Sequence, residues 1–573
     1  MTEKTIDTDV LVIGSGAAGV AAALRAAHDG HRVLVIEKDE RLGGTTAISG
    51  GWLWVPGNEQ GVREGDTREE AETYIKYLAK GRHNPEMVDT FLDEVPVAMR
   101  FFADDAGIEF QYPQKAPDYQ MDAPGAKVSG RAVTVKAADA RMLGADRLRV
   151  QPYLQSYTVF GYMPEVGPDI ATFLKANQTL RAFGYAARKV SKTWVQTLLH
   201  KRAYGRTNGN ALMTRMITAA ARQGIPMWTA TPALEIVIDD HGVAIGARIG
   251  GEHAGLVRAR LGVVIAAGGF SGNAELRRRY FPHDPDGTNH CTPTIGHHGD
   301  SLKLAQPLGG HIDDSPHQPA SWGPVTTFTG LRGQQRWFPH LRAFGLPGLI
   351  AVDRDGVRFA NESLSYHDYG VEMIRNDAGR DGTYGWIIAD AKAMRRYGIG
   401  YAKPWPFPQT YFRRSGFLHK AATVAELART IDVPADQLQA TLDEFNAGAA
   451  RGEDPKFHRG SNWFHHFKGD MDHKPNPNLA PIDQGPYYAV KIEMGDLGTY
   501  AGLAVNTRSE VLDAVGDPVP GLYAVGTAAV SVFGGGYPGY GANIGPAMIF
   551  GHTVGRDIAA HAAERAERVS AGM

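Results

Sequence analysis

The sequence predicts an α/β fold with two domains, one of them inserted into the other. Residues 9–37 follow the order strand, glycine-rich turn, helix and strand, which is typical of a parallel α/β unit. Two later apolar runs, 261–273 and 520–526, again contain a strand that leads into glycine. Between them, residues 274 to about 483 are richer in His, Pro, Trp and Asn and lack a regular hydrophobic period. We therefore expect one domain formed by two outer segments and an inserted α+β domain, with boundaries at 1–273, 274–483 and 484–573.

Length and composition narrow the class of protein. The chain has 573 residues, more than one ordinary domain holds, and its apolar content of 43% is that of a globular protein. A net charge of −2 gives no general attraction to nucleic acid. The single cysteine, Cys291, excludes an internal disulfide and a cysteine metal cluster. The polar first residues do not form a signal peptide. We expect a cytoplasmic protein with no bound metal and no nucleic acid partner.

The turn in the first stretch has the spacing of a dinucleotide site. Gly14 permits a sharp turn, and Gly16 lets the backbone approach a pyrophosphate. The helix that begins near Ala17 and Ala18 would direct its first N–H groups at the phosphates. Glu37 ends the second strand, about 20 residues on, where a ribose hydroxyl needs an acceptor. This combination predicts a Rossmann-like dinucleotide-binding domain.

A loop of small and hydroxyl-bearing residues follows Glu37 and Lys38, and can pass close to a flat cofactor. It resembles the loop beneath FAD in the superfamily of flavoproteins that contains fumarate reductases and 3-ketosteroid dehydrogenases. The resemblance implies FAD as the cofactor and a Rossmann-like FAD-binding domain with an inserted capping domain. Some relatives attach FAD through a histidine in this loop. The loop here has none, so we expect non-covalent FAD bound by Lys38, Gly43, Gly44, Thr45, Thr46, Ser49, Gly50 and Gly51.

Three later segments resemble other FAD-contacting elements of these flavoproteins. A strand expected over 228–238 would run along the adenine, and the strands within 261–273 and 520–526 would approach the nucleotide through their terminal glycines. The closing helix, with Pro546 in its first turn, would direct its positive end at the flavin. The residues expected to contact FAD in these segments are Ala233, Ala267, Gly268, Gly269, Gly526, Asn543 and Ile544.

Tyrosines in three separate segments resemble the catalytic residues of the 3-ketosteroid Δ1-dehydrogenase branch. Tyr119 stands in a loop rich in Pro and Gly, Tyr366 follows an RFANE stretch, and Tyr537 stands four residues before Gly541. The resemblance implies that Tyr366 is the base and that Tyr119 assists it. It also implies that the Tyr537 hydroxyl and the Gly541 N–H bind the ketone oxygen. Judged from the residues alone, each tyrosine could instead be an aromatic group packed for stability.

The resemblance implies a dehydrogenase that introduces a C=C bond next to the ketone of a cyclic 3-keto compound. Hydride would pass to N5 of FAD and a proton to a tyrosine. Because the ordinary pKa of tyrosine is about 10, a neighbour, for which Tyr119 is the candidate, would have to lower the pKa of Tyr366. Residues 495–499 read GDLGT where fumarate reductases carry a histidine, which argues against dicarboxylate reduction.

Other functions stay open at this point. Tyr540 stands where ketosteroid enzymes carry a small residue, so a smaller cyclic ketone is an alternative substrate. The same chemistry run backward would make the protein a reductase of an enone or another activated alkene. A flavoprotein that only transfers electrons is a third possibility. The sequence indicates neither the electron acceptor nor the oligomeric state.

One segment has an unusual charge distribution. Residues 170–234 contain ten basic residues and no acidic one, with aromatic residues interleaved. The simpler interpretation is a solvated face or a set of ion pairs with acids elsewhere in the chain. The alternative is a surface that contacts an anionic membrane. The basic residues are Lys175, Arg181, Arg188, Lys189, Lys192, Lys201, Arg202, Arg206, Arg215 and Arg222.

Overall fold

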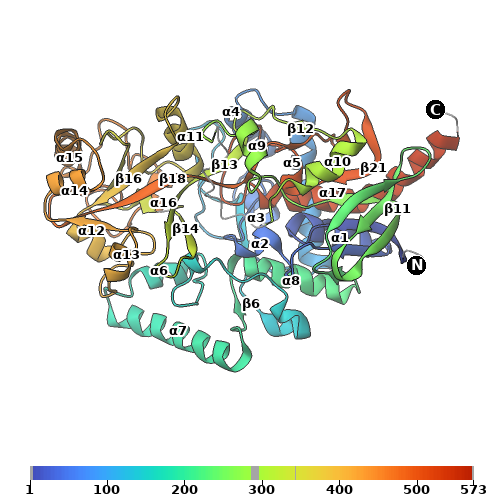
Figure 1. Cartoon of the computed structure of the whole chain (residues 1–573), viewed down its shortest axis with the longest axis horizontal. Helices are drawn as coiled ribbons and strands as arrows, with labels where there is room; N and C mark the ends of the chain where they lie inside the picture. Colours follow the sequence, from blue (N-terminus) through green and yellow to red (C-terminus); the bar gives the residue numbers. More distant parts are fainter. Residues whose placement is uncertain (1–3, 285–295, 342, 571–573) are drawn as a thin grey trace.

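The computed structural model describes residues 4–284, 296–341 and 343–570, and two large β-sheets organise it. Figure 1 shows the first sheet and its helices near the two chain ends, and the second sheet at the opposite end of the long axis. The predicted α/β class with an inserted α+β part is confirmed. Among the described residues, no helix is both long enough and apolar enough to cross a bilayer.

The first sheet has a parallel centre that begins with the predicted strand–turn–helix–strand unit. Strand β1 (Thr5–Ile13) pairs in parallel with β2 (Val33–Ile36) on one side and with β11 (Gly255–Ile265) on the other. The sheet continues through β8 (Met227–Trp228), β21 (Pro518–Ala524), β20 (Glu510–Leu512) and the antiparallel strands β9 (Ala233–Ile238) and β10 (Ala244–Ile249). Both outer segments of the chain therefore contribute to one sheet.

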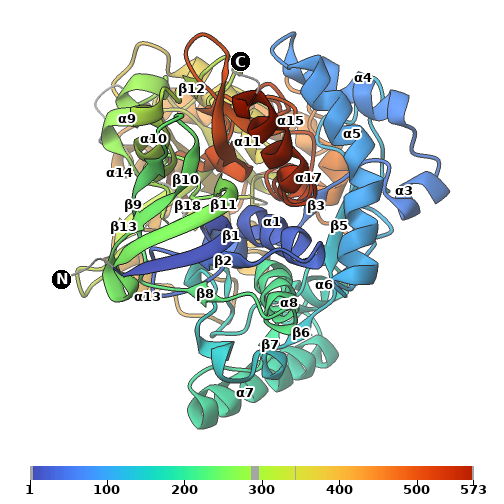
Figure 2. The ribbon, with the colours of Figure 1, turned by 90° about the vertical axis from the view of Figure 1, so that its right-hand side faces the viewer.

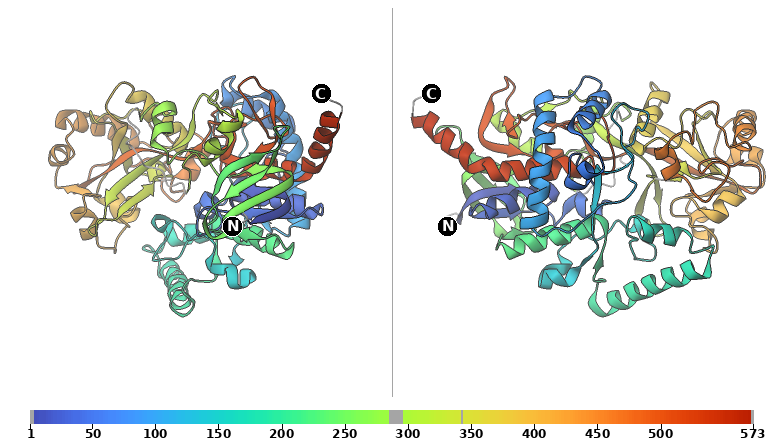
Figure 3. Two further views of the ribbon diagram at one scale, coloured as in Figure 1. Left: turned by 45° about the vertical axis from the view of Figure 1, so that its right-hand side comes forward. Right: turned by 180° about the vertical axis from the view of Figure 1, so that it is seen from behind.

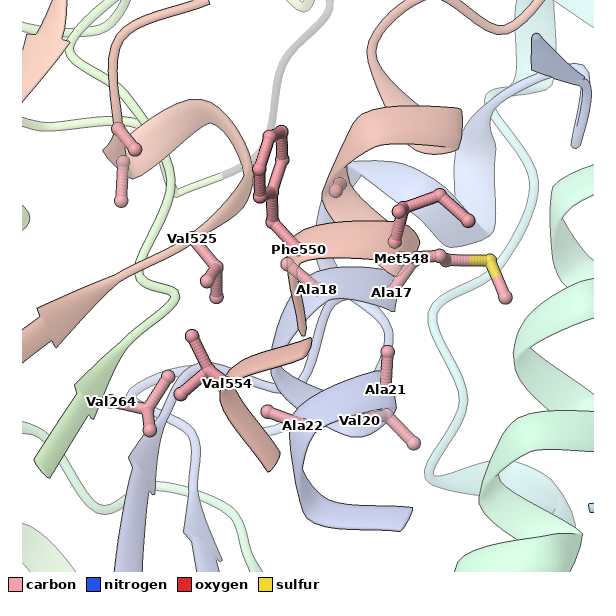
Figure 4. Close-up of a cluster of buried hydrophobic side chains, with 14 of the residues drawn as sticks. Ala17, Ala18, Val20, Ala21, Ala22, Val264, Val525, Met548, Phe550 and Val554 are labelled. Carbon is pink, nitrogen blue, oxygen red and sulfur yellow. The ribbon is translucent and has the colours of Figure 1, made fainter. Parts of the chain in front are cut away.

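Two helices pack together on this sheet because small residues let them approach closely. Helix α1 (Ala17–His28) is almost entirely buried and lies against α17 (Ile544–Ser570), as Figures 2 and 4 show. A Cβ atom at Gly551 would lie 2.5 Å from the Ala18 carbonyl oxygen, and one at Gly555 would lie 2.4 Å from that of Ala22. This contact fixes the N-terminal ends of both helices beside the glycine-rich turn.

The second sheet is antiparallel, in the order β14-β13-β18-β16-β15, with β17 paired to β18. Its strands are β13 (Ala320–Thr329), β14 (Gln335–Pro339), β15 (Leu349–Val352), β16 (Tyr384–Ala389), β17 (His419–Ala421) and β18 (Tyr487–Thr499). Helix α11 (Tyr366–Asn376) packs on β13, and α14 (Val424–Thr430) and α15 (Ala435–Ala449) cover the outer side. Because β18 is central, this sheet extends past the boundary expected at residue 484.

Smaller elements fill the space around the two sheets. Helices α4 (Arg68–Ala79) and α5 (Pro85–Arg100) pack beside a small sheet made of β3 (Leu53–Trp54), β5 (Ala132–Val135) and β4 (Phe110–Gln111). Several short α-helices lie between these elements: α2 (Gly44–Ile48), α3 (Glu59–Arg63), α9 (Ala274–Tyr280), α10 (Asp300–Ala305), α12 (Ala391–Arg396), α13 (Thr410–Arg414) and α16 (Trp463–Lys468).

The segment with ten basic residues contains most of three helices. Helix α8 (Asn208–Arg222) is buried beneath the first sheet, whereas α6 (Pro168–Leu174) and α7 (Leu180–His200) project beyond it (Figures 2 and 3). The strand expected over 228–238 is also divided. Residues 229–232 leave the sheet between β8 and β9, which turns Thr231 and Pro232 toward a cavity.

Candidate active site

A continuous cavity of about 1660 Å³ connects the glycine-rich turn to the second sheet. It is lined by eighteen of the twenty residues expected to contact the cofactor: Gly14, Gly16, Ala17, Ala18, Glu37, Lys38, Gly44, Thr45, Thr46, Ser49, Gly50, Gly51, Ala233, Ala267, Gly268, Gly526, Asn543 and Ile544. Gly43 and Gly269 lie outside this lining. A Cβ atom would lie 2.9 Å from the Ala47 side chain at Gly43 and 2.0 Å from Thr499 Oγ1 at Gly269. These two glycines therefore serve close packing.

The glycine-rich turn has the geometry of a phosphate cradle. Gly14 has a φ of +113°, and a Cβ atom there would lie 2.3 Å from the Ala266 carbonyl oxygen. At Gly16 the atom nearest to such a Cβ, Thr46 Oγ1, is 3.8 Å away, so the missing side chain leaves room in the cavity. The Ala17 N–H donates to Thr46 Oγ1 at 3.2 Å. Helix α1 thus begins at an open, hydroxyl-lined space that suits a pyrophosphate.

The acid at the end of β2 is held in place by its neighbours. Glu37 Oε2 accepts hydrogen bonds from the Ser15 N–H at 3.1 Å and the Ser15 hydroxyl at 2.7 Å. Lys38 forms an ion pair with Asp300 and donates to the Gly296 carbonyl at 2.7 Å. The Glu37 carboxylate is therefore oriented by Ser15, a residue that the sequence reasoning missed because it is a variable position of the glycine motif.

A buried histidine gives an independent test of whether the cavity fits FAD. His297 lines the cavity, and its Nε2 lies 3.3 Å from Thr45 Oγ1. Its buried Nδ1 has no hydrogen-bond partner among the described residues. Burial and then the nearby Lys38 charge lower the pKa of His297 to about 4, so the ring is neutral and can donate or accept. An unsatisfied buried polar atom beside the cavity is what a polar cofactor would satisfy, and these residues fit FAD.

FAD is expected to be released when the protein is denatured. The loop containing Thr45 and Thr46 has no histidine for a covalent bond, and His297 approaches it only from a distant part of the sequence. Acid precipitation should therefore leave a colourless pellet and a yellow supernatant. A pellet that stays yellow would contradict non-covalent binding, and peptide mapping of the pellet would then show whether His297 carries the flavin.

Three of the predicted tyrosines meet in one cluster. The Tyr119 hydroxyl donates to the Tyr366 hydroxyl at 3.0 Å. The ring of Tyr537 stacks on Tyr119 at 5.3 Å between centroids and meets Tyr366 edge-on, also at 5.3 Å. Tyr366, Tyr537 and Gly541 line the cavity, whereas Tyr119 lies behind Tyr366 and outside the lining. The fold thus brings together three tyrosines that are at least 171 positions apart in the sequence. Only two of them, Tyr366 and Tyr537, face the cavity.

Tyr119 was expected to lower the pKa of Tyr366, but this prediction is wrong, because the pKa is raised. Burial, followed by the nearby phenol groups of Tyr119 and Tyr537, raises the pKa of Tyr366 well above 10. The physical reason is that water is excluded and no cation lies among the causes that act on this hydroxyl. Burial also raises the pKa of Tyr537 to about 12, which keeps its hydroxyl protonated and able to donate a hydrogen bond.

One carboxylate connects the segments that carry two of the tyrosines. Asp368 accepts hydrogen bonds from the Ser365 hydroxyl at 2.6 Å and from the Gln120 amide at 2.8 Å. Ser365 caps α11, whose first residue is Tyr366. Asp368 was not among the residues predicted from the sequence, although a serine followed three residues later by an acid is a recognisable helix-start signal.

A buried ion cluster fixes the loop that carries Tyr119. The guanidinium of Arg131 contacts Asp66 and Asp118, each at 2.8 Å, and all three side chains are almost fully buried. Asp118 also accepts from the Trp54 indole N–H at 2.8 Å. Burial raises the pKa of Asp118 to about 6 despite its contact with Arg131. These contacts hold the residue before Tyr119 and limit where its ring can lie.

Aromatic rings narrow the cavity next to the tyrosine cluster. Tyr540 packs against Trp52 at 5.1 Å between centroids, against Tyr119 at 4.8 Å and against Phe467 at 5.8 Å. Tyr540, Trp52 and Phe467 all line the cavity. The bulky residue noted in the sequence is therefore part of the wall beside Gly541.

This arrangement agrees with what comparisons with known proteins show. A protein-family model described as an FAD binding domain matches residues 9–544. The chain belongs to this FAD-binding family. It therefore binds FAD, as the fit of the cavity indicates.

Individual relatives of this flavoprotein cover nearly the whole chain. It is 58% identical to 4-oxocyclohex-2-ene-1-carboxylate 5-dehydrogenase of Sinomonas cyclohexanicum over 98% of this chain and 95% of the relative. It is 34% identical to 3-oxosteroid 1-dehydrogenase of Mycobacterium tuberculosis over 97% of this chain and 99% of the relative.

A solved structure shares the fold of this flavoprotein. The crystal structure of 3-ketosteroid Δ1-dehydrogenase from Sterolibacterium denitrificans, in complex with 1,4-androstadiene-3,17-dione, has a TM-score of 0.88 and 30% identity. The comparison covers 97% of this chain and 99% of that chain. The predicted family is confirmed, and the flavoprotein is an FAD-dependent oxidoreductase that acts on CH–CH groups. These similarities support a flavin dehydrogenase of a cyclic ketone.

Proposed function

We propose that this flavoprotein removes two hydrogens from a small six-membered ring that carries a ketone and a carboxylate, a proton from the carbon next to the ketone and a hydride from the carbon after it. The observation that carries the proposal is the tyrosine cluster: Tyr366 and Tyr537 line the same cavity as the FAD-binding residues, with Gly541 beside them. The 58% identity to a dehydrogenase of 4-oxocyclohex-2-ene-1-carboxylate supports this substrate class over a steroid.

Bound FAD supplies the hydride acceptor, and residues of the chain bind the ketone oxygen and accept the proton. Tyr537, protonated because its pKa is raised to about 12, donates to the ketone oxygen together with the Gly541 N–H. These donors favour negative charge on that oxygen as the neighbouring carbon loses a proton. Tyr366 in its ionised form takes this proton, and its hydrogen bond with the Tyr119 hydroxyl 3.0 Å away orients the accepting oxygen.

The wall made by Tyr540, Trp52 and Phe467 supports a small substrate. The ring centroid of Tyr540 lies 5.1 Å from that of Trp52 and 5.8 Å from that of Phe467, next to the proposed ketone site. A single six-membered ring needs much less room along this wall than four fused rings. Aromatic walls also suit a flat, apolar ring while leaving its polar ends to specific donors.

Product analysis tests the proposed reaction. Holoenzyme, an artificial electron acceptor and 4-oxocyclohex-2-ene-1-carboxylate should give a product two hydrogens lighter, with the new C=C bond next to the ketone by NMR. A 3-ketosteroid should react much more slowly. Turnover of the steroid alone would contradict the proposed substrate class. Reduction of the ring by reduced enzyme, without any dehydrogenation, would instead identify an enone reductase.

Opening the aromatic wall is expected to change substrate preference. Tyr540→Ser removes the ring that packs on Trp52 and enlarges the cavity, so kcat/KM for a 3-ketosteroid should rise relative to the small ketone by about tenfold or more. Tyr77→Ser, at an exposed position of α4 outside the cavity, is the matched control. An unchanged ratio in Tyr540→Ser would show that Tyr540 does not limit substrate size.

A further inference from the structure

Helix α7 leaves one of its faces uncovered at the edge of the molecule, as Figures 1 and 3 show. Of its 21 residues only Ala182 and Thr193 are buried. The side chains of Leu180, Leu198 and Leu199 are 91%, 86% and 68% exposed. Single exposed leucines are common on protein surfaces, but several large apolar groups on one helix mark an interaction site.

Apart from Leu199, which lies among the neighbouring cations, the exposed apolar residues of α7 lie on one continuous stripe. Viewed down the helix axis, successive side chains are rotated by about 100°. In this view the arc that begins at Val190 and ends at Val195 spans about 140° and contains no charged residue. Three cations border this arc on one side: Arg181, Arg188 and Lys192. The residues of the stripe are Val190, Phe183, Trp194, Ala187, Leu180, Leu198, Ser191, Gly184 and Val195.

Ion pairs with acids elsewhere explain only part of the basic segment. Lys175 pairs with Asp472 at 2.5 Å, Lys189 lies 3.9 Å from Asp169, and Arg215 pairs with Glu109 at 2.9 Å. Within the described part of the chain, Arg181, Arg188 and Lys192 form no ion pair. Lys201, Arg202, Arg206 and Arg222 also form no ion pair among the described residues, and of these Arg202 and Arg206 donate to backbone carbonyls instead.

Exposed aromatic rings and a cation also lie opposite α7, beside the entrance to the cavity. Phe160 packs against Phe407 at 5.3 Å and against Trp194 of α7 at 6.2 Å, and all three are exposed. Arg395 lies over the exposed ring of Trp405 at 5.3 Å. Phe183, Val190 and Trp194 line the same cavity as Tyr366, so the uncovered face adjoins the entrance to the active site.

We propose that α7 lies on the surface of an anionic lipid bilayer, with its apolar stripe among the acyl chains and its cations at the headgroups. An apolar face bordered by cations matches such a surface. A second copy of the chain fits less well, because two cationic borders would repel each other. This docking goes beyond the proposed reaction and does not depend on it.

Flotation of the holoenzyme with vesicles tests the docking. Vesicles of phosphatidylcholine and phosphatidylglycerol in equal parts should carry the protein at low salt, whereas vesicles of phosphatidylcholine alone should carry much less. High salt should weaken binding to the anionic vesicles, because it screens the cations. Protein that stays unbound with both vesicles, or binds both equally, would overturn the proposal.

Two matched variants locate the surface. Leu180→Glu combined with Leu198→Glu changes α7 outside the cavity lining, and should reduce the ratio of bound to free protein at least about tenfold. Val515→Glu changes an exposed apolar residue between β20 and β21 and should bind like the parent. Both variants should retain turnover of the small ketone. Equal losses in both variants, or a dimer by sedimentation that only the α7 variant abolishes without vesicle binding, would contradict docking through α7.

Discussion

Replacing Tyr366 with phenylalanine is expected to reduce turnover by a factor of about 10² or more, the usual contribution of a positioned general base. The ring and its contacts with Tyr119 and Tyr537 remain, while the oxygen that accepts the proton is lost. FAD content and folding should be close to normal, and ketone binding only mildly weaker. Steady-state kinetics with the small cyclic ketone give the comparison.

Tyr369→Phe is the matched control, because Tyr369 is a buried tyrosine of the same helix and does not line the cavity. It should keep turnover near that of the parent. Turnover of Tyr366→Phe within a few-fold of the parent, with full FAD content, would mean that another residue is the base.

The pH dependence of kcat/KM is a second test of Tyr366 as the base. The pKa of Tyr366 lies well above 10, so its ionised fraction rises with pH across the neutral and alkaline range. If the ionised form is the base, kcat/KM should rise about tenfold per pH unit below the pKa. Tyr366→Phe should lose this slope, and Tyr369→Phe should retain it.

Replacing Tyr537 with phenylalanine is expected to weaken both ketone binding and turnover. Its hydroxyl would hold the ketone oxygen before reaction and hold it more strongly as negative charge develops, and removing one such donor typically costs 10²–10³ in kcat. The signature that separates it from Tyr366→Phe is a clear rise in the Kd of the ketone, measured by flavin spectral titration.

Tyr500→Phe controls for the loss of a buried hydroxyl near this position. The Tyr500 ring lies 6.3 Å from that of Tyr537, and its buried hydroxyl has no partner among the described residues. Its replacement should leave ketone binding unchanged. If Tyr537→Phe binds the ketone as tightly as Tyr500→Phe does, Tyr537 does not bind the ketone oxygen.

The nucleotide half of the site was predictable because its parts are adjacent in the sequence. Gly14, Gly16 and Glu37 belong to one strand–turn–helix–strand unit, whose spacing alone determines which groups face the phosphates and ribose. The roles of Gly43 and Gly269 could not be predicted from the sequence. Whether a loop glycine faces a cavity or a neighbouring side chain depends on packing from distant segments, here Ala47 and Thr499.

The substrate half could be predicted only through the family resemblance. Tyr119, Tyr366 and Tyr537 come from three distant segments, and no local pattern indicates that two of their hydroxyls meet at 3.0 Å. The sign of the pKa shift at Tyr366 depends on burial and on the phenol groups of Tyr119 and Tyr537 beside it, which a sequence does not reveal. The position of β18 at the centre of the second sheet was hidden for the same reason, since strand order depends on long-range pairing.

The most direct test of the central claim is one anaerobic turnover of the oxidised holoenzyme. Mixing it with 4-oxocyclohex-2-ene-1-carboxylate in the absence of any acceptor should bleach the visible absorbance of FAD, with one equivalent of the dehydrogenated ketone formed per flavin. The bleaching should be at least about 10² slower in Tyr366→Phe. A flavin that stays yellow with this ketone, but is bleached by dithionite and reoxidised by an enone, would contradict the proposed dehydrogenation.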